Sequence, residues 1–157
     1  MKGAIEEMQK SESKMSQKQF GEAEKHLKSA LKQAPDDYAA LLMMSKCLVE
    51  QKKIAEAKQY AEKAQQVYPN EAQAHYLAGA LKLQAKAFEA AHSDFKQYDK
   101  LLPGNPSILF LKGYSLEGMG QVKPAAENYY AYLKQVNQGN QAQYAYQRLI
   151  EWGYLKR

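Results

Sequence analysis

Apolar and small residues recur along the chain with a period of 34 residues. One position is always alanine, at Ala23, Ala57, Ala91 and Ala125. A large apolar residue stands three residues before it, at Phe20, Ile54, Phe88 and Val122. Further apolar or small positions follow four and seven residues after each alanine, which is the spacing of one helix face. Each repeat is therefore predicted to contain an amphipathic helix that packs closely on its neighbour.

Another helix is predicted to precede this one, so that each repeat has a first and a second helix. The first helix carries a small residue that lets two helices cross closely, at Ser11, Ser45, Gly79 and Gly113. Prolines follow the same period, at Pro35, Pro69 and Pro103. Segments such as Pro35-Asp36-Asp37 combine a helix stop with an N-cap residue for the next helix. A period of this length indicates a repeat protein.

With repeats at 4–37, 38–71, 72–105 and 106–139, the chain resembles the tetratricopeptide repeat family. The third repeat carries the resemblance best, through Gly79, Phe88, Ala91, Phe95 and Pro103. The resemblance implies an all-α fold, a right-handed α-solenoid of helix-turn-helix repeats, in one domain over residues 1–157. Residues 140–152 repeat the first-helix spacing through Tyr146, Leu149 and Ile150, and they are expected to form a C-terminal capping helix.

The first helix of the first repeat departs from this pattern. Its expected core positions are too polar to bury, because they fall on Glu7, Lys10, Ser11 and Lys14. A shift of one residue gives a less polar set, Ala4, Met8, Ser11 and Met15. We expect this helix to be frayed, out of register, or cut from a segment on which it normally packs.

The formal net charge is +5 and the isoelectric point is near 9.1, which raises the question of nucleic acid. The cations are almost all lysines spread over every predicted helix, with arginine only at Arg148 and Arg157. This distribution is typical of solvated faces, and no nucleic-acid partner is predicted. No run approaches the roughly 18 apolar residues of a membrane span, so no membrane insertion is predicted. The chain is expected to be cytoplasmic as written, or periplasmic if a signal or upstream region was removed.

Candidate chemistry is sparse. Cys47 is the only cysteine and is expected to be a small packed residue. His26, His75 and His92 lie in separate predicted helices without a metal-binding spacing, and His75 is expected to be a packed or half-buried ring. No phosphate-binding glycine loop or nucleophile motif is present. We predict no enzyme activity, no cofactor and no metal site.

The family resemblance implies that the first helices line a concave groove for a peptide or amphipathic helix of another protein. The corresponding positions are Met43, Lys46, Gln73, Tyr76, Ala80, Phe110, Tyr114, Glu117, Tyr144 and Arg148. They are largely aromatic and aliphatic with isolated polar groups, as protein-binding surfaces are. Leu42, Leu77 and Leu111 face the groove in one interpretation and pack between helices in the other. The family's carboxylate clamp for a chaperone tail is not predicted, because its places hold Met8, Glu12, Met43, Gln73 and Leu77.

Three functional hypotheses follow. The favoured one is an adaptor or scaffold for another protein, with Tyr76, Phe110 and Tyr114 as anchors. The second is a C-terminal regulatory or docking domain of a larger protein, because the segment AYQRLIEWGYLK weakly resembles the end of the repeat region in bacterial zinc metallopeptidases. The third is self-association, with a homodimer formed through the N-terminal end.

Overall fold

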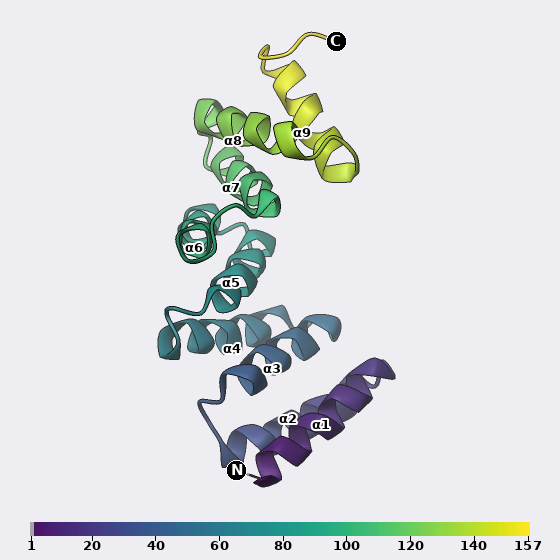
Figure 1. The fold of residues 1–157 in the computed structure, drawn as a ribbon. Coiled ribbons are helices and arrows are strands. Elements are labelled where there is room, and N and C mark those ends of the chain that lie inside the picture. The colour runs from purple at the N-terminus through teal and green to yellow at the C-terminus, as the bar shows by residue number, and fades with distance from the viewer. Residues whose placement is uncertain (1) are drawn as a thin grey trace. The chain divides into compact units, whose positions relative to one another are not determined.

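A computed structural model describes residues 2–157, and within this range the chain forms nine α-helices and no strands (Figure 1). The helices are α1 (Lys2–Ser16), α2 (Phe20–Gln33), α3 (Tyr38–Glu50), α4 (Ile54–Val67), α5 (Ala72–Gln84), α6 (Phe88–Leu101), α7 (Pro106–Gly118), α8 (Val122–Gln135) and α9 (Asn140–Glu151). From α4 to α8, each helix begins and ends 34 residues after its equivalent in the preceding repeat. The predicted all-α fold of helix-turn-helix repeats is confirmed.

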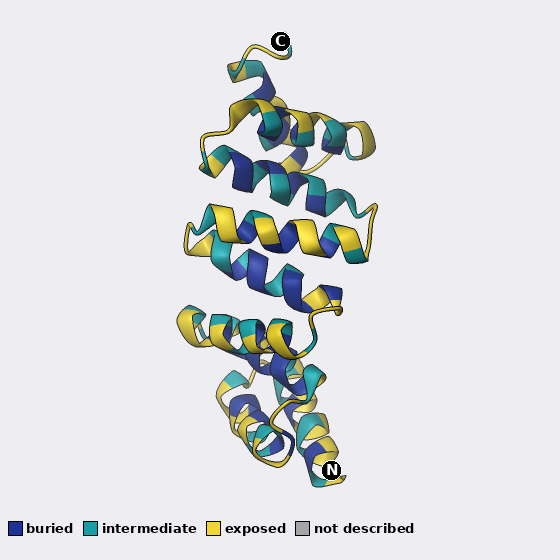
Figure 2. Ribbon diagram, turned by 90° about the vertical axis from the view of Figure 1, so that its left-hand side faces the viewer, coloured by how far each residue is buried: buried dark blue, intermediate teal, exposed yellow. Residues whose placement is uncertain are grey.

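The chain divides into two compact bodies, an N-terminal body that ends at Leu81 and a C-terminal body over Lys82–Arg157. Buried and exposed residues alternate along the helices of each body with the helical period (Figure 2). The alanines that define the period are all fully buried, at Ala23, Ala57, Ala91 and Ala125. The second helices are therefore packed through the face that the sequence pattern predicts.

The turn from first to second helix has the same backbone conformation in all four repeats. One residue in each turn lies in the left-handed region, with φ of 60° at Lys18, 63° at Lys52, 60° at Lys86 and 76° at Gly120. The next residue donates its N–H to a carbonyl five residues earlier, as Lys53 does to Leu48 at 2.9 Å. This pair of features is a Schellman motif, which ends one helix and directs the chain into the next.

Two helices begin at the N-cap residues that the sequence predicts. Asp37 precedes α3 and accepts a hydrogen bond from the Ala40 N–H at 2.9 Å. Asn105 precedes α7 and accepts one from the Ser107 N–H at 3.0 Å, with Pro106 in the first turn. These side chains satisfy backbone donors that the helix itself leaves unpaired.

The core of the N-terminal body joins α2 to α5 through side chains such as Leu27, Met44 and Leu81. Cys47 is buried in this core, where its Sγ lies 3.1 Å from the Phe20 carbonyl oxygen, and burial raises the pKa of the thiol. His75 is also buried: its Nε2 donates to the Pro69 carbonyl at 2.7 Å. Both predictions of packed residues are confirmed.

Helix α1 adopts the shifted register. Ala4 and Ser11 are buried, and Met8 packs against a small cluster with Ala30 and Ala34 of the N-terminal body. The expectation of an out-of-register helix is confirmed, but fraying is not, because α1 is continuous over Lys2–Ser16. Glu7, which the unshifted register would bury, instead pairs with His26 at 2.8 Å between Oε2 and Nδ1.

The core of the C-terminal body is rich in aromatic residues. Tyr129 of α8 is fully buried and lies against α7 at Gly113, where an added Cβ would stand 2.8 Å from the Tyr129 ring. The small residue predicted at this crossing is therefore required by the ring that faces it. Helix α9 packs through Ala142, Ala145 and Leu149. Tyr146, which repeats the first-helix spacing, is 45% exposed.

Candidate functional site

The ten residues predicted to face the groove fall into two sets of five, one in each body. In the N-terminal body, Lys46 on α3 and Gln73 on α5 are exposed. Met43, Tyr76 and Ala80 are half-buried, and Met43 packs against the core. The first helices α3 and α5 meet through Leu42, which is buried, with Leu77 and Ala74 in the same cluster. Leu42 is thus a packing residue, in line with the second of the two interpretations.

In the C-terminal body, the structure brings the other five predicted residues together on α7 and α9. The rings of Phe110 and Tyr114 stack with centroids 6.2 Å apart, and Tyr144 lies 6.0 Å from Phe110 and 5.8 Å from Tyr114. Phe110 is 7% exposed and belongs to the core. It therefore supports the two tyrosines from beneath, whereas Tyr114 and Tyr144 are half-buried at the surface.

Glu117 fixes the position of this aromatic group. Its two carboxylate oxygens each accept one tyrosine hydroxyl at 2.8 Å, Oε1 from Tyr129 and Oε2 from Tyr144. Arg148 adds the opposite charge, with Nε 3.2 Å from Glu117 Oε2. Two acceptor bonds and an adjacent cation satisfy a carboxylate whose side chain is 19% exposed. We refer to Tyr114, Glu117, Tyr144 and Arg148 as the α7–α9 wall.

Arg148 is itself held from three sides. It forms an ion pair with Glu151 one turn along α9, in addition to the pair with Glu117. Its guanidinium carbon lies 4.8 Å from the centre of the Trp152 ring, within the range of a cation–π contact. Trp152 in turn stacks on Tyr129 at 6.0 Å. The wall is thus one connected set of charged and aromatic side chains.

Burial raises the pKa values of Tyr129 and Tyr144 well above that of a free tyrosine, and their bonds to Glu117 raise them further. Both hydroxyls therefore stay protonated and donate to the carboxylate at any physiological pH. The two hydroxyl bonds hold the Glu117 carboxylate in a fixed orientation between α8 and α9. Within residues 2–157, no group of three or more metal-ligating side chains is present.

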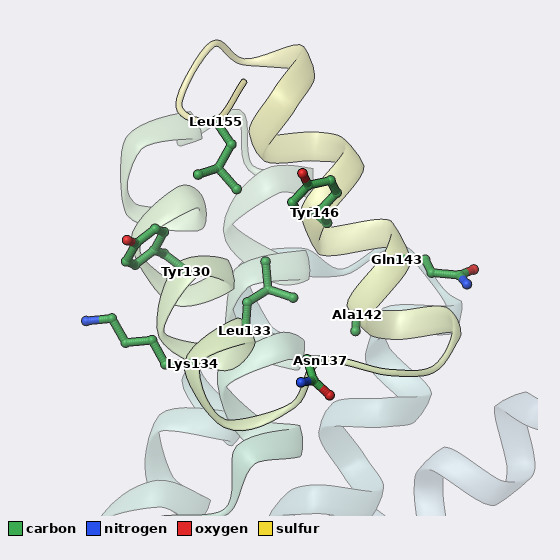
Figure 3. A pocket seen from close by; sticks show the side chains of 8 residues that line it. All are labelled: Tyr130, Leu133, Lys134, Asn137, Ala142, Gln143, Tyr146 and Leu155. Atoms are coloured by element: carbon green, nitrogen blue, oxygen red, sulfur yellow. The ribbon is translucent and has the colours of Figure 1, made fainter. Parts of the chain in front are cut away.

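Sequence reasoning missed a hollow on the other side of α9. It has a volume of about 520 Å³ and lies between α8, α9 and the residues that follow α9 (Figure 3). Its lining includes Tyr130, Leu133, Lys134, Ala142, Tyr146 and Leu155. None of the ten predicted residues lines it. The hollow is marked by the exposed rings of Tyr130 and Tyr146. The sequence shows the two tyrosines but not their exposure, because exposure depends on whether a further helix covers them.

None of the helices described in residues 2–157 is long and apolar enough to cross a membrane.

Comparison with known proteins agrees with the repeat pattern. Residues 14–81 match the family described as tetratricopeptide repeat. A search of curated proteins finds no match to the chain. Among solved structures, "MamA 41-end from Desulfovibrio magneticus RS-1" has a TM-score of 0.90 at 18% identity, covering 98% of this chain and 88% of its own. A tetratricopeptide repeat protein from Parabacteroides merdae ATCC 43184 has a TM-score of 0.85 at 18% identity, covering 96% of this chain and 60% of its own. At these identities the likeness establishes the fold.

Proposed function

Residues 14–81 belong to the tetratricopeptide repeat family, and from this premise we propose that the chain is a scaffold that binds another protein. The partner contributes an extended peptide or an amphipathic helix, which lies along the inner faces of the first helices. In this proposal the chain has no catalytic role and needs no cofactor.

The observation that carries the proposal is the α7–α9 wall. Tyr114 and Tyr144 present half-buried rings, while Phe110, Glu117 and Arg148 hold them in place. Because these rings are already fixed, a partner that packs on them loses little side-chain entropy. Tyrosine also combines a large apolar area with a polar tip, and it is enriched among residues that dominate binding energy.

The N-terminal body supplies a more polar set. Lys46 is exposed on α3, and Gln73 is exposed on α5, the helix that also carries the half-buried Tyr76. Exposed polar groups around an aromatic residue contribute orientation and specificity more than affinity. We therefore assign anchoring to the tyrosines and selection of the partner to Lys46 and Gln73.

The test is affinity capture from the lysate of the source cell, with mass spectrometry of what is retained. The parent chain is compared with Tyr114→Ala and with Tyr76→Ala. A control, Leu102→Ala, removes an exposed apolar side chain of the same body that belongs to neither proposed binding surface. Loss of an anchoring tyrosine costs about 2 kcal/mol, which weakens the dissociation constant roughly 30-fold.

Circular dichroism must first show that every variant is folded. A protein retained by the parent and by Leu102→Ala, but lost with Tyr114→Ala, supports the wall as the binding surface. Equal retention by all four chains contradicts the assignment.

The alternatives have weaker support. The similarities to known proteins contribute nothing in favour of a docking domain of a metallopeptidase. For self-association through the N-terminal end, α1 exposes one large apolar side chain, Ile5, beside the exposed Glu6 and Glu12. Such a face is poor in the apolar area that a stable homodimer interface buries.

A further inference from the structure

Helix α9 ends in the same way as the first helices of the four repeats. Gly153 has a φ of 82°, and its N–H donates to the Ile150 carbonyl at 3.0 Å. The N–H of Tyr154 then donates to the Leu149 carbonyl, five residues earlier, at 2.8 Å. These are the two bonds of the Schellman motif that leads into the second helix at Lys52 and Gly120. Helix α9 therefore ends like the first helix of a repeat, although it is also the last helix described.

The N-terminal body shows what normally covers such a helix. There α4 packs on α2 and α3 through Ala57, Ala61 and Ala64. Beneath it, Leu41 and Met44 of α3 are both 0% exposed. The repeat equivalents of α2 and α3, 102 residues further on, are α8 and α9. The surface of α8 and α9 is therefore built as a seat for a second helix.

This seat is open in the C-terminal body. Tyr146 is the repeat equivalent of Met44, and it is 45% exposed instead of fully buried. Tyr130 of α8 is 48% exposed and Tyr154 is 50% exposed. These are three of the few large hydrophobic side chains that the described residues expose. The repeat equivalents of Tyr130 and Tyr154, which are Lys28 and Lys52, stay exposed beside α4. A second helix would therefore bury Tyr146, which removes apolar area from water, and would lie beside the other two rings.

Two adjoining hollows mark the place that a second helix would take, and we call them together the α8–α9 slot. The larger, of about 520 Å³, has Leu133, Tyr146 and Leu155 directed into the space between α8 and α9 (Figure 3). The smaller, of about 360 Å³, continues along α8 past Tyr130 to Tyr154. Tyr130 and Lys134 line both hollows. The slot is thus elongated along α8, as a seat for a helix must be.

Charge at the slot is predominantly positive. Lys123 and Lys134 line it, and Lys134 lies with its Nζ 5.2 Å from the centre of the Tyr130 ring. Glu127 is the one carboxylate among the residues that line the two hollows. In Figure 3, Lys134 extends outward from the edge of the larger hollow. An occupant that carries acidic side chains along its flank would complement these lysines.

We propose that the α8–α9 slot binds an amphipathic helix of another protein, seated as the second helix of a repeat is seated. The bound helix places small apolar residues against Tyr130, Leu133 and Tyr146, and acidic residues beside Lys123 and Lys134. This site lies on a different face of α9 from Tyr144 and Arg148, so it is independent of the α7–α9 wall.

The test uses the full chain and a synthetic peptide that copies residues 54–67, the sequence of α4. In the acidic probe, Lys58→Glu and Lys63→Glu place carboxylates on its polar flank. A matched basic probe carries Glu56→Lys and Glu62→Lys instead. Fluorescence anisotropy of the labelled peptides measures affinity, and ¹H–¹⁵N shift changes in the chain locate the contact. Short peptides are only marginally helical alone, so binding includes the cost of ordering the helix.

We expect saturable binding of the acidic probe, with shift changes on α8 and α9, weaker binding of the basic probe, and weakening by salt. The double variant Tyr130→Ser/Tyr146→Ser should weaken binding at least tenfold, because it removes two exposed rings and leaves the core intact. The control Leu102→Ser, which changes an exposed apolar residue of the same body outside the slot, should bind as the parent does.

Absence of saturable binding, equal binding by the double variant, or shift changes confined to other helices would each overturn the proposal. Sedimentation velocity of the chain alone tests whether a second copy of the chain, rather than another protein, fills the slot. A concentration-dependent dimer that Tyr130→Ser/Tyr146→Ser abolishes would mean that a second copy fills the slot, and the assignment to another protein would be wrong.

Discussion

Glu24 joins three helices of the N-terminal body and provides the sharpest test of the packing described above. Its side chain, on α2, is 9% exposed. It forms ion pairs with Lys28 at 2.9 Å and with Lys53, at the start of α4, at 3.2 Å. It also accepts a hydrogen bond at 2.8 Å from Gln51, at the end of α3. The bond from Lys28 and those from Gln51 and Lys53 lower the pKa of Glu24 from 4.5 to about 2, against the opposing effect of burial.

The substitution Glu24→Gln removes the charge and keeps the shape. A pKa difference of this size corresponds to roughly 3 kcal/mol of stability as an upper bound. Lys28 and Lys53 are 63% and 44% exposed, so solvent screens part of this interaction. We expect Glu24→Gln to lower the free energy of unfolding by about 2 kcal/mol at pH 7.

The pH dependence follows from the direction of the shift. Because the folded pKa lies below the unfolded one, the contribution is complete above about pH 4.5 and is lost as the pH falls towards 2. Urea unfolding followed by circular dichroism at pH 7, 4 and 3 should therefore show the difference between parent and variant shrinking. Glu12→Gln, at an exposed position of α1, is the control. A difference below about 0.5 kcal/mol at pH 7, or one independent of pH, would refute this account.

Further predictions concern the turns, a helix crossing and the thiol. Lys86→Gly relieves a left-handed backbone at φ of 60° and should stabilise the chain by about 0.5–1 kcal/mol in urea unfolding, whereas Lys96→Gly within α6 should destabilise it by about 1 kcal/mol. Gly113→Ala drives a Cβ to 2.8 Å from the buried Tyr129 ring and should cost about 1–3 kcal/mol by the same measurement; an unchanged midpoint would show that the ring can move. Cys47 is buried with a raised pKa, so a thiol reagent such as dithionitrobenzoate should label it only when the chain unfolds, and rapid labelling of the folded chain would contradict its burial.

The α7–α9 wall is only partly predictable from the sequence. The spacing of Phe110, Tyr114 and Glu117 along α7 predicts that they share one side of a helix. The same spacing cannot separate the core residue Phe110 from the surface residue Tyr114, because they lie one helical turn apart on that side. The distinction depends on α8 and α9, whose rings of Tyr129, Tyr132 and Tyr144 enclose Phe110. The bonds that hold Glu117 likewise come from residues far along the chain.

The 34-residue period and the helix-turn-helix repeats follow from the sequence alone, because helix periodicity, the caps at Asp37 and Asn105, and the proline stops all act over a few residues. Which helix faces are covered depends instead on tertiary contacts. The register of α1 is ambiguous by one residue in the sequence, and the contact of Glu7 with His26 and the burial of Ala4 fix it. Tyr146 follows the packing pattern of a first helix, yet it is exposed because no second helix lies over α9 within the described residues. A residue is buried only when a neighbouring helix packs against it. The periodic sequence shows which face of a helix is apolar, but it does not show whether another helix covers that face.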